Sequence, residues 1–131
     1  MDNFRLQIIT PDRIFFDKEV YMVEFNTTEG EIGVYANHIP LTSIIKPGIL
    51  TIRMDGEEKE AALHSGFVEI LPDKVTILAE VIEWPEEIDL HRAEAAMERA
   101  KERIAHRTSM TDIARAETAL MRAMARITLL K

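Results

Sequence analysis

The chain has 131 residues, of which 47% are hydrophobic and 30% charged, and its formal net charge is −7. These totals favour one domain, or a small domain with an appendage, and they argue against a general nucleic-acid-binding protein, because such proteins usually present a basic face. The lack of cysteine excludes disulfides and thiol chemistry, and without a membrane-length apolar run or a secretory signal we expect no direct membrane insertion.

The charge is unevenly distributed along the chain. Residues 1–84 carry 7 basic and 15 acidic side chains, whereas residues 85–131 carry 9 basic and 8 acidic ones. The chain therefore divides into an acidic first part and a nearly neutral, arginine-rich second part, with the change of composition at Trp84-Pro85. We predict two domains, residues 1–84 and residues 85–131.

Residues 3–84 are typical of an all-β domain. Short runs rich in β-branched and aromatic residues are separated by glycine and proline, and no helical period interrupts them. The expected strands cover residues 4–10, 14–16, 20–25, 49–54, 60–64, 66–71 and 75–81. Asp55-Gly56 and Pro72-Asp73 predict tight turns between consecutive strands. This arrangement favours a β-sandwich or flattened barrel.

After Pro85 the hydrophobic period changes from that of a strand to that of a helix. One series consists of Leu90, Ala93, Met97, Ala100 and Ile104, and a second of Ile113, Ala116, Leu120, Ala123, Ile127 and Leu130. Residues 106–112 break the pattern, Asp89 is suited to cap the first helix, and Thr111 or Asp112 can cap the second. The sequence therefore predicts an antiparallel α-helical hairpin, with a hinge at residues 84–88.

The two helical segments resemble each other. Residues 90–104 align with residues 113–127, with eight of fifteen positions identical, and shared coiled-coil geometry is the simplest explanation. Both apolar series are rich in alanine, which buries little apolar area per residue, and helices of this length are marginal in isolation. We predict that the hairpin holds together only when it is docked on the sandwich or on a partner.

Arginines recur on both helices. Three of them, Arg92, Arg99 and Arg115, have an acidic residue three positions away at which an ion pair can form. Arg103, Arg122 and Arg126 have no such neighbour on their own helix. Arginines without partners on one face indicate either a solvated face or an anionic partner, such as a nucleotide phosphate or an acidic protein segment.

No group of residues predicts catalysis or metal binding. His38 has no second histidine or carboxylate at ligand spacing, so a structural role is favoured. Asp12, Glu29 and Glu31 lack surroundings that would divide acid and base roles, and no glycine-rich loop is followed by the lysine of a phosphate site. We therefore expect no catalytic residue and no metal site.

The stretch from Asn26 to Leu50 carries the most specific pattern. It contains Gly30-x-x-Gly-Val, then His38-x-Pro-Leu, then Lys46-Pro-Gly, and this order resembles the signature of the epsilon subunit of bacterial F-type ATP synthases. The chain departs from the family at residues 35–37, where many members have Leu-Pro-Gly, but asparagine at position 37 tolerates the left-handed backbone region. The resemblance implies a loop that contacts partners, formed by Tyr35, Asn37, His38, Pro40 and Leu41.

A second resemblance lies at the start of the first helix. Ile88-Asp89-Leu-His-Arg92-Ala93 is similar to the Ile/Leu-Asp-x-x-Arg-Ala motif with which epsilon subunits of the bacillar kind bind ATP. The resemblance implies that Asp89 accepts a hydrogen bond from the adenine amino group and that Ile88 lies near the base. It also implies that Arg99, Arg122 and Arg126 neutralise phosphates. ATP would then be a regulatory ligand, with no cofactor required.

The resemblance covers essentially the whole chain and implies a function. The protein would be a non-catalytic rotor subunit of the central stalk, serving ATP synthesis driven by hydrogen-ion transport. Its partners would be the gamma subunit, the c-ring and the alpha/beta catalytic head, and it would lie as a peripheral protein on the cytoplasmic side of the bacterial plasma membrane. The hairpin would move between a folded form and an extended form that inhibits ATP hydrolysis.

Two other classes of protein stay open from the residues themselves. One is a stand-alone nucleotide-sensing β-sandwich module, and the other is a small sandwich enzyme that acts on acidic sugars or lipids. Co-purification with a long coiled-coil rotor subunit would separate a stalk subunit from both, whereas turnover of a small substrate by the isolated chain would favour the enzyme.

Overall fold

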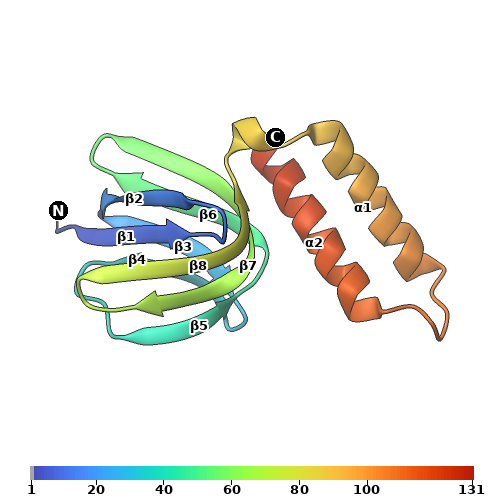
Figure 1. The fold of residues 1–131 in the computed structure, drawn as a ribbon, viewed down its shortest axis with the longest axis horizontal. Helices are drawn as coiled ribbons and strands as arrows, with labels where there is room; N and C mark the ends of the chain where they lie inside the picture. Colours follow the sequence, from blue (N-terminus) through green and yellow to red (C-terminus); the bar gives the residue numbers. More distant parts are fainter. Residues whose placement is uncertain (1) are drawn as a thin grey trace.

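Eight strands form one continuous sheet that folds over on itself, and two helices lie beside it, as seen in the computed structural model, which describes residues 2–131 (Figure 1). The strands are β1 (Phe4–Ile9), β2 (Ile14–Val20), β3 (Met22–Thr27), β4 (Gly30–Tyr35), β5 (Leu41–Ile45), β6 (Gly48–Met54), β7 (Glu57–Ile70) and β8 (Lys74–Glu83). The expected β-sandwich followed by two helices is confirmed.

The sheet closes through two strands that each have three neighbours. β3 pairs with β4, β5 and β6, and β7 pairs with β5, β6 and β8. β1 extends the sheet by a parallel pairing with β8, and β2 follows at the edge. Because β5 and β6 both connect β3 to β7, the strands enclose one core in the manner of a flattened barrel.

The strand boundaries differ from the predicted ones at several places. The runs 60–64 and 66–71 are not separate strands, because β7 continues through Gly66 by way of an irregularity in its pairing with β8. Val20 ends β2 and does not begin β3, and β2 itself is longer than the predicted run 14–16. The turns at Asp55-Gly56 and Pro72-Asp73 are confirmed, since Met54 pairs with Glu57 and Ile70 with Val75.

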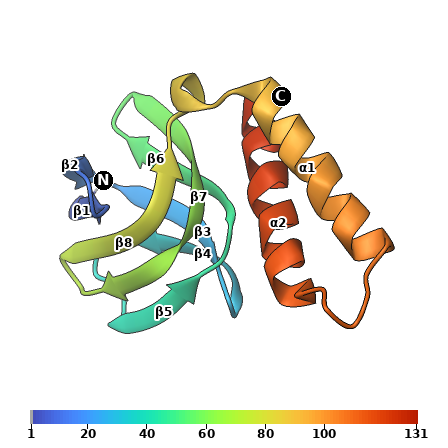
Figure 2. The ribbon, with the colours of Figure 1, turned by 45° about the vertical axis from the view of Figure 1, so that its right-hand side comes forward.

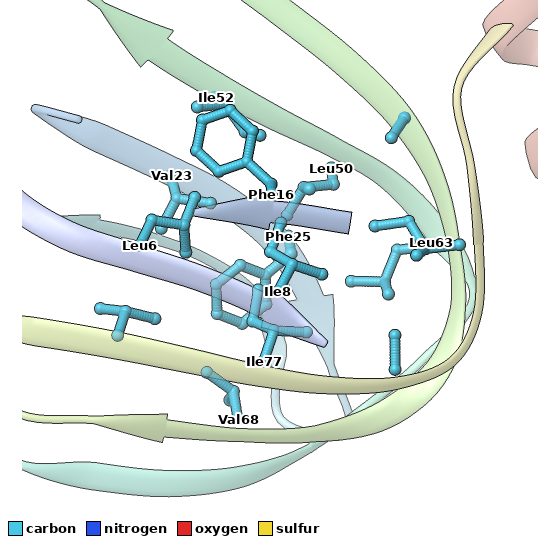
Figure 3. Packing of buried hydrophobic residues seen from close by; sticks show 14 of the residues in the cluster. Leu6, Ile8, Phe16, Val23, Phe25, Leu50, Ile52, Leu63, Val68 and Ile77 are labelled. Carbon is cyan, nitrogen blue, oxygen red and sulfur yellow. The ribbon is translucent and has the colours of Figure 1, made fainter. Parts of the chain in front are cut away.

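The core lies between the folded halves of the sheet (Figure 3). It follows from alternation, because every second residue of β1 points inward. Phe25 of β3 lies among side chains from opposite parts of the sheet, with Leu50 of β6 and Ile77 of β8 in the same cluster. These three side chains are almost completely buried, so the sandwich has an apolar core independent of the helices.

The helices are α1 (Leu90–Ala105) and α2 (Ile113–Leu130), preceded by the short 3₁₀ helix η1 (Pro85–Glu87). Asp89 and Asp112 cap them, each accepting a hydrogen bond from the backbone N–H three residues on. The alanines of the predicted seam, Ala93 and Ala100 on α1 with Ala116 and Ala123 on α2, are buried. The predicted helical hairpin and its inward-facing series are therefore confirmed.

α2 lies between the sandwich and α1 in both views (Figures 1 and 2). It contacts β6 and β7, and it also contacts η1, beside which the C-terminus lies. Among residues 2–131, no helix combines the length and the apolar character needed to cross a bilayer. α2 is thus the element through which the hairpin docks on the sandwich.

Candidate functional site

A cavity of about 360 Å³ opens where the sandwich, η1 and both helices meet. Its lining consists of Glu83, Glu87, Ile88, Asp89, Arg92, Ala93, Ala96, Arg99 and Arg126. Six of the seven residues that the sequence assigned to a nucleotide site therefore lie around one cavity, and Arg122 is the exception. Glu83, Glu87 and Ala96 were not among the candidates.

α1 contributes one wall of the cavity through its first three turns. Asp89, Arg92, Ala96 and Arg99 follow at spacings of three and four residues, so they lie on one face of the helix. Asp89 Oδ1 caps the helix at 3.1 Å from the backbone nitrogen of Arg92. The sequence suggested an ion pair between the side chains of Asp89 and Arg92, but in the structure the Asp89 carboxylate caps the helix instead. The suggested pair of Arg115 with Asp112 is also absent, because Asp112 caps α2 by accepting from the backbone N–H of Arg115.

The guanidinium groups of Arg92 and Arg99 are not neutralised within the chain. Neither forms an ion pair with any side chain of residues 2–131, and both residues are exposed at the cavity. The suggested pair of Arg99 with Glu102 is absent, because Glu102 pairs with His106 at 2.9 Å. The cavity therefore presents two free cations on the face of α1.

Arg126 enters the cavity from α2 and is held by the sandwich. Its Nε donates to Glu83 Oε1 at 2.7 Å, and the same oxygen accepts from Nε2 of the buried His64 at 2.8 Å. Burial opposes ionisation of Glu83, but the hydrogen bonds from His64 and Arg126 outweigh it and hold the pKa of the carboxyl below its usual value. Glu83 is thus an ionised anchor shared by β7 and α2.

Arg122, one turn before Arg126, lies outside the cavity lining. Its Nη2 donates to Ser65 Oγ at 3.0 Å and lies 3.8 Å from Glu80 Oε2, so it contacts the sandwich. The sequence could not reveal the partners of these two arginines, because spacing within α2 says nothing about carboxylates on β8. Strand alternation offered a partial signal, since Glu80 falls on the outward face of β8.

The segment that joins the sandwich to α1 is attached firmly at its first residue. Trp84 stacks on Phe15 with ring centroids 4.2 Å apart, and its backbone N–H donates to Glu87 Oε1 at 2.9 Å. Arg13 binds both oxygens of Glu87 at 2.9 Å, and this contact together with the Trp84 N–H lowers the pKa of Glu87. Any pivot of the hairpin would therefore start after Glu87.

The candidate contact loop joins β4 to β5 and is largely exposed. Asn37 has a φ of 62°, so it adopts the left-handed conformation expected of it. Its backbone N–H donates to Pro72 O at 2.9 Å, which ties the loop to the β7–β8 turn. Tyr35, Pro40 and Leu41 are exposed, whereas His38 is half-buried, with Nδ1 3.0 Å from Ile39 O.

Sequence reasoning missed an exposed row of apolar side chains across five adjacent strands. The pairings Ile44–Phe67, Phe67–Leu78, Leu78–Ile9 and Ile9–Ile14 run from β5 through β7, β8 and β1 to β2. The exposed fractions are 59% for Ile44, 43% for Phe67, 50% for Leu78 and 63% for Ile14, with Ile9 half-buried. We call this set the apolar row. Contiguous exposed apolar surface of this kind marks an interaction site.

The cavity offers chemistry for binding and not for bond cleavage. Its polar groups are three guanidinium groups and three carboxylates, and its lining contains no serine, threonine, cysteine or histidine. Within residues 2–131 no three potential metal-ligating side chains cluster together. Guanidinium groups suit phosphate oxygens and carboxylates suit N–H or hydroxyl donors, so the arrangement fits a phosphorylated molecule that also carries donors.

Comparison with known families matches both parts of the chain. Residues 3–85 match the family model described as the beta-sandwich domain of the ATP synthase delta/epsilon chain. Residues 86–131 match the model described as the long alpha-helix domain of the same chain. Together the two models account for nearly every residue.

Individual relatives agree with the family match, and a solved structure shares the fold. The ATP synthase epsilon chain of Ruminiclostridium cellulolyticum is 46% identical over 97% of this chain and 95% of its own length. That of Bacillus velezensis is 41% identical over 97% and 96%. A solved structure of the Euglena gracilis mitochondrial ATP synthase (OSCP/F1/c-ring) contains a chain with a TM-score of 0.86 and 23% identity over 98% of this chain and 82% of that one.

Proposed function

The chain belongs to the ATP synthase delta/epsilon family, as an epsilon chain and hence a non-catalytic subunit of the synthase, and from this premise we propose that it is a rotor subunit of the central stalk. In this role it transmits rotation during ATP synthesis coupled to hydrogen-ion transport. The family match over nearly the whole chain is the observation that carries the proposal. It also disfavours a stand-alone nucleotide sensor or a small sandwich enzyme.

Two surfaces of the sandwich suit the proposed partners. The apolar row offers a broad, exposed apolar face for the gamma subunit, since apolar area buried between subunits stabilises their association. The loop with Tyr35, Asn37, His38, Pro40 and Leu41 offers a smaller contact for the c-ring. With these partners the protein would lie at the cytoplasmic side of the bacterial plasma membrane, as a peripheral subunit. An extended hairpin would reach the alpha/beta head.

ATP is the proposed regulatory ligand of the cavity. Arg92 and Arg99 are free to bind phosphate oxygens, and Arg126 approaches from the opposite helix. Asp89 uses Oδ1 for the helix cap, which leaves Oδ2 to accept from the adenine amino group, with Ile88 beside the base. Because α1, α2 and the sandwich all contribute lining residues, a ligand bound there stabilises the docked hairpin.

Regulation follows from movement of the hairpin after Glu87. In the docked form, α2 is held by Arg122 and Arg126 and by small side chains such as Ala125. In the proposed extended form these arginines leave the sandwich and bind acidic segments of the head, where the hairpin blocks ATP hydrolysis. ATP favours the docked form, because only this form completes the cavity.

Calorimetric titration of the isolated protein with ATP tests the ligand. We expect saturable binding that Arg92→Ala and Arg126→Ala each weaken by about tenfold or more, as each removes a charge-assisted contact. Arg103→Ala is the matched control, since Arg103 lies one turn from Arg99 but outside the cavity lining. Equal loss in all three variants, or no binding at millimolar ATP, would contradict the site and leave the stalk role intact.

A further inference from the structure

A β-bulge in β7 aims two consecutive side chains at β8 and α2. The pairing of β7 with β8 is regular up to Leu63–Ile82, shifts on either side of Ser65, and omits His64. Consecutive residues of a regular strand point to opposite faces, whereas a bulge re-aims a side chain. Here His64 reaches Glu83 at 2.8 Å and Ser65 reaches Glu80 at 3.0 Å.

α2 meets this bulge with two arginines that are one turn apart. Arg122 contacts Ser65 and Glu80, and Arg126 contacts Glu83. Each arginine therefore contacts a β8 carboxylate that also forms a hydrogen bond with a bulge residue. We use the name bulge latch for the set His64, Ser65, Glu80, Glu83, Arg122 and Arg126. The latch shares Glu83 and Arg126 with the cavity.

The surroundings of His64 define its protonation state. Its side chain is completely buried, and because the ionised Glu83 only accepts hydrogen bonds, Nε2 carries the proton between them. Nδ1 is buried without a partner among residues 2–131. The charged groups that face the ring are Glu83 from β8 and Arg122 and Arg126 from α2. A second proton on Nδ1 would have no acceptor and would add positive charge beside two arginines.

We propose that His64 is a positioning residue, whose neutral ring holds Glu83 in place for Arg126, and whose protonation releases α2 from the sandwich. Burial lowers the pKa of His64 in the docked protein below its ordinary value of 6.5, and the arginines add to this effect while Glu83 opposes it. Docking is therefore strongest above about pH 6.5 and weakens as the pH falls toward the docked-state pKa, because the released form binds the additional proton. Only the expected effect on ATP binding at the cavity rests on the proposed function, and the role of His64 in the docking of α2 does not.

Hydrogen exchange of the α2 amides tests the release directly. Between about pH 7.5 and about pH 5.5, after correction for intrinsic exchange rates, we expect protection of α2 in the wild type to fall by about tenfold relative to the β strands. His64→Gln keeps an N–H donor for Glu83 but does not titrate, so its α2 protection should change less than twofold. His106→Gln, which alters an exposed histidine at the C-terminal cap of α1, should behave as the wild type. The same loss in His64→Gln as in the wild type overturns the proposal.

Nitrogen NMR of the wild type provides a measurement that needs no variant. We expect the His64 ring to carry its proton on Nε2 at neutral pH and to titrate below the midpoints of the exposed histidines. A midpoint equal to or above theirs overturns the proposal even if His64→Gln fails to fold.

ATP titrations at the same pH values separate this proposal from the proposed function. Ionisation of the nucleotide affects both proteins equally, so the ratio of the Kd of the wild type to that of His64→Gln isolates His64. Because the apparent Kd is inversely proportional to the docked fraction, we expect this ratio to rise only by the factor by which that fraction falls, and a loss of the docked form in hydrogen exchange without a matching rise counts against His64. If the wild type binds no ATP, the ligand assignment fails, and hydrogen exchange still decides the role of His64.

Discussion

Replacing Glu83 by glutamine should loosen the docking of α2 by a predictable amount. The amide oxygen can still accept hydrogen bonds from Arg126 Nε and His64 Nε2, which lie 2.7 and 2.8 Å from the carboxylate oxygen. What is lost is the charge, and a charge-assisted hydrogen bond is about twice as strong as a neutral one, so each bond weakens by about 1 kcal/mol. The carboxylate is mostly buried, with 23% of its side chain exposed, so solvent screens little of this loss. Only the Arg126 bond joins α2 to the sandwich, because His64 and Glu83 both belong to the sandwich and stay together when α2 leaves, so we expect docking to weaken by about 1 kcal/mol.

Hydrogen exchange measured by mass spectrometry reports this loss of docking energy as a faster exchange rate of the amides. A loss of about 1 kcal/mol corresponds to about fivefold faster exchange of the α2 amides, with the amides of β1 and β3 unchanged. Glu117→Gln is the matched control, because it removes the same charge from an exposed position of α2. A change of less than about twofold in Glu83→Gln, or equal changes in both variants, would refute the reasoning that this ion pair docks the helix.

Two further predictions concern the sandwich. A Cβ at Gly66 would lie 2.2 Å from the backbone oxygen of Leu78, which cannot move aside. Gly66→Ala should therefore lower the free energy of unfolding in urea by about 3 kcal/mol. Gly33→Ala, where a Cβ would have no atom nearer than 3.9 Å, should lower it much less. Phe67→Glu alters an exposed side chain of the apolar row. It should weaken binding to a purified gamma subunit by about tenfold or more while leaving the unfolding midpoint unchanged. Unaltered binding would show that the apolar row is not part of that interface.

The helices could be predicted from the sequence because their signals are local. Asp89 and Asp112 mark the first residues of α1 and α2 through side chain to backbone hydrogen bonds that span three residues. The buried seam follows from a period that repeats within one helix. Asn37 is similar, since its left-handed conformation depends on a single residue type. Each of these features is contained within a few neighbouring positions.

The features that sequence reasoning missed depend on pairing between distant strands. The apolar row exists only because the register sets Ile44, Phe67 and Leu78 side by side, although each is an ordinary apolar residue within its own strand. The bulge at His64 merged two predicted strands into β7 and created the contact with Glu83. Arg126 seemed unpaired for the same reason, because its partner is 43 residues away in the chain.

The balance of forces at the hairpin would allow the proposed ligand to control it. α2 presents few large apolar side chains to the sandwich: Ala125 is buried, while Met121 and Met124 are 37% and 49% exposed. Docking therefore depends on ion pairs worth about 1 kcal/mol each and not on a large apolar interface. A ligand of the cavity at 100 times its Kd would add about 2.7 kcal/mol, which is similar in size. When the docking energy and the ligand-binding energy are comparable, the occupancy of the cavity decides what fraction of the hairpins is docked. A leucine-rich interface would keep the hairpin docked whether or not ATP is bound.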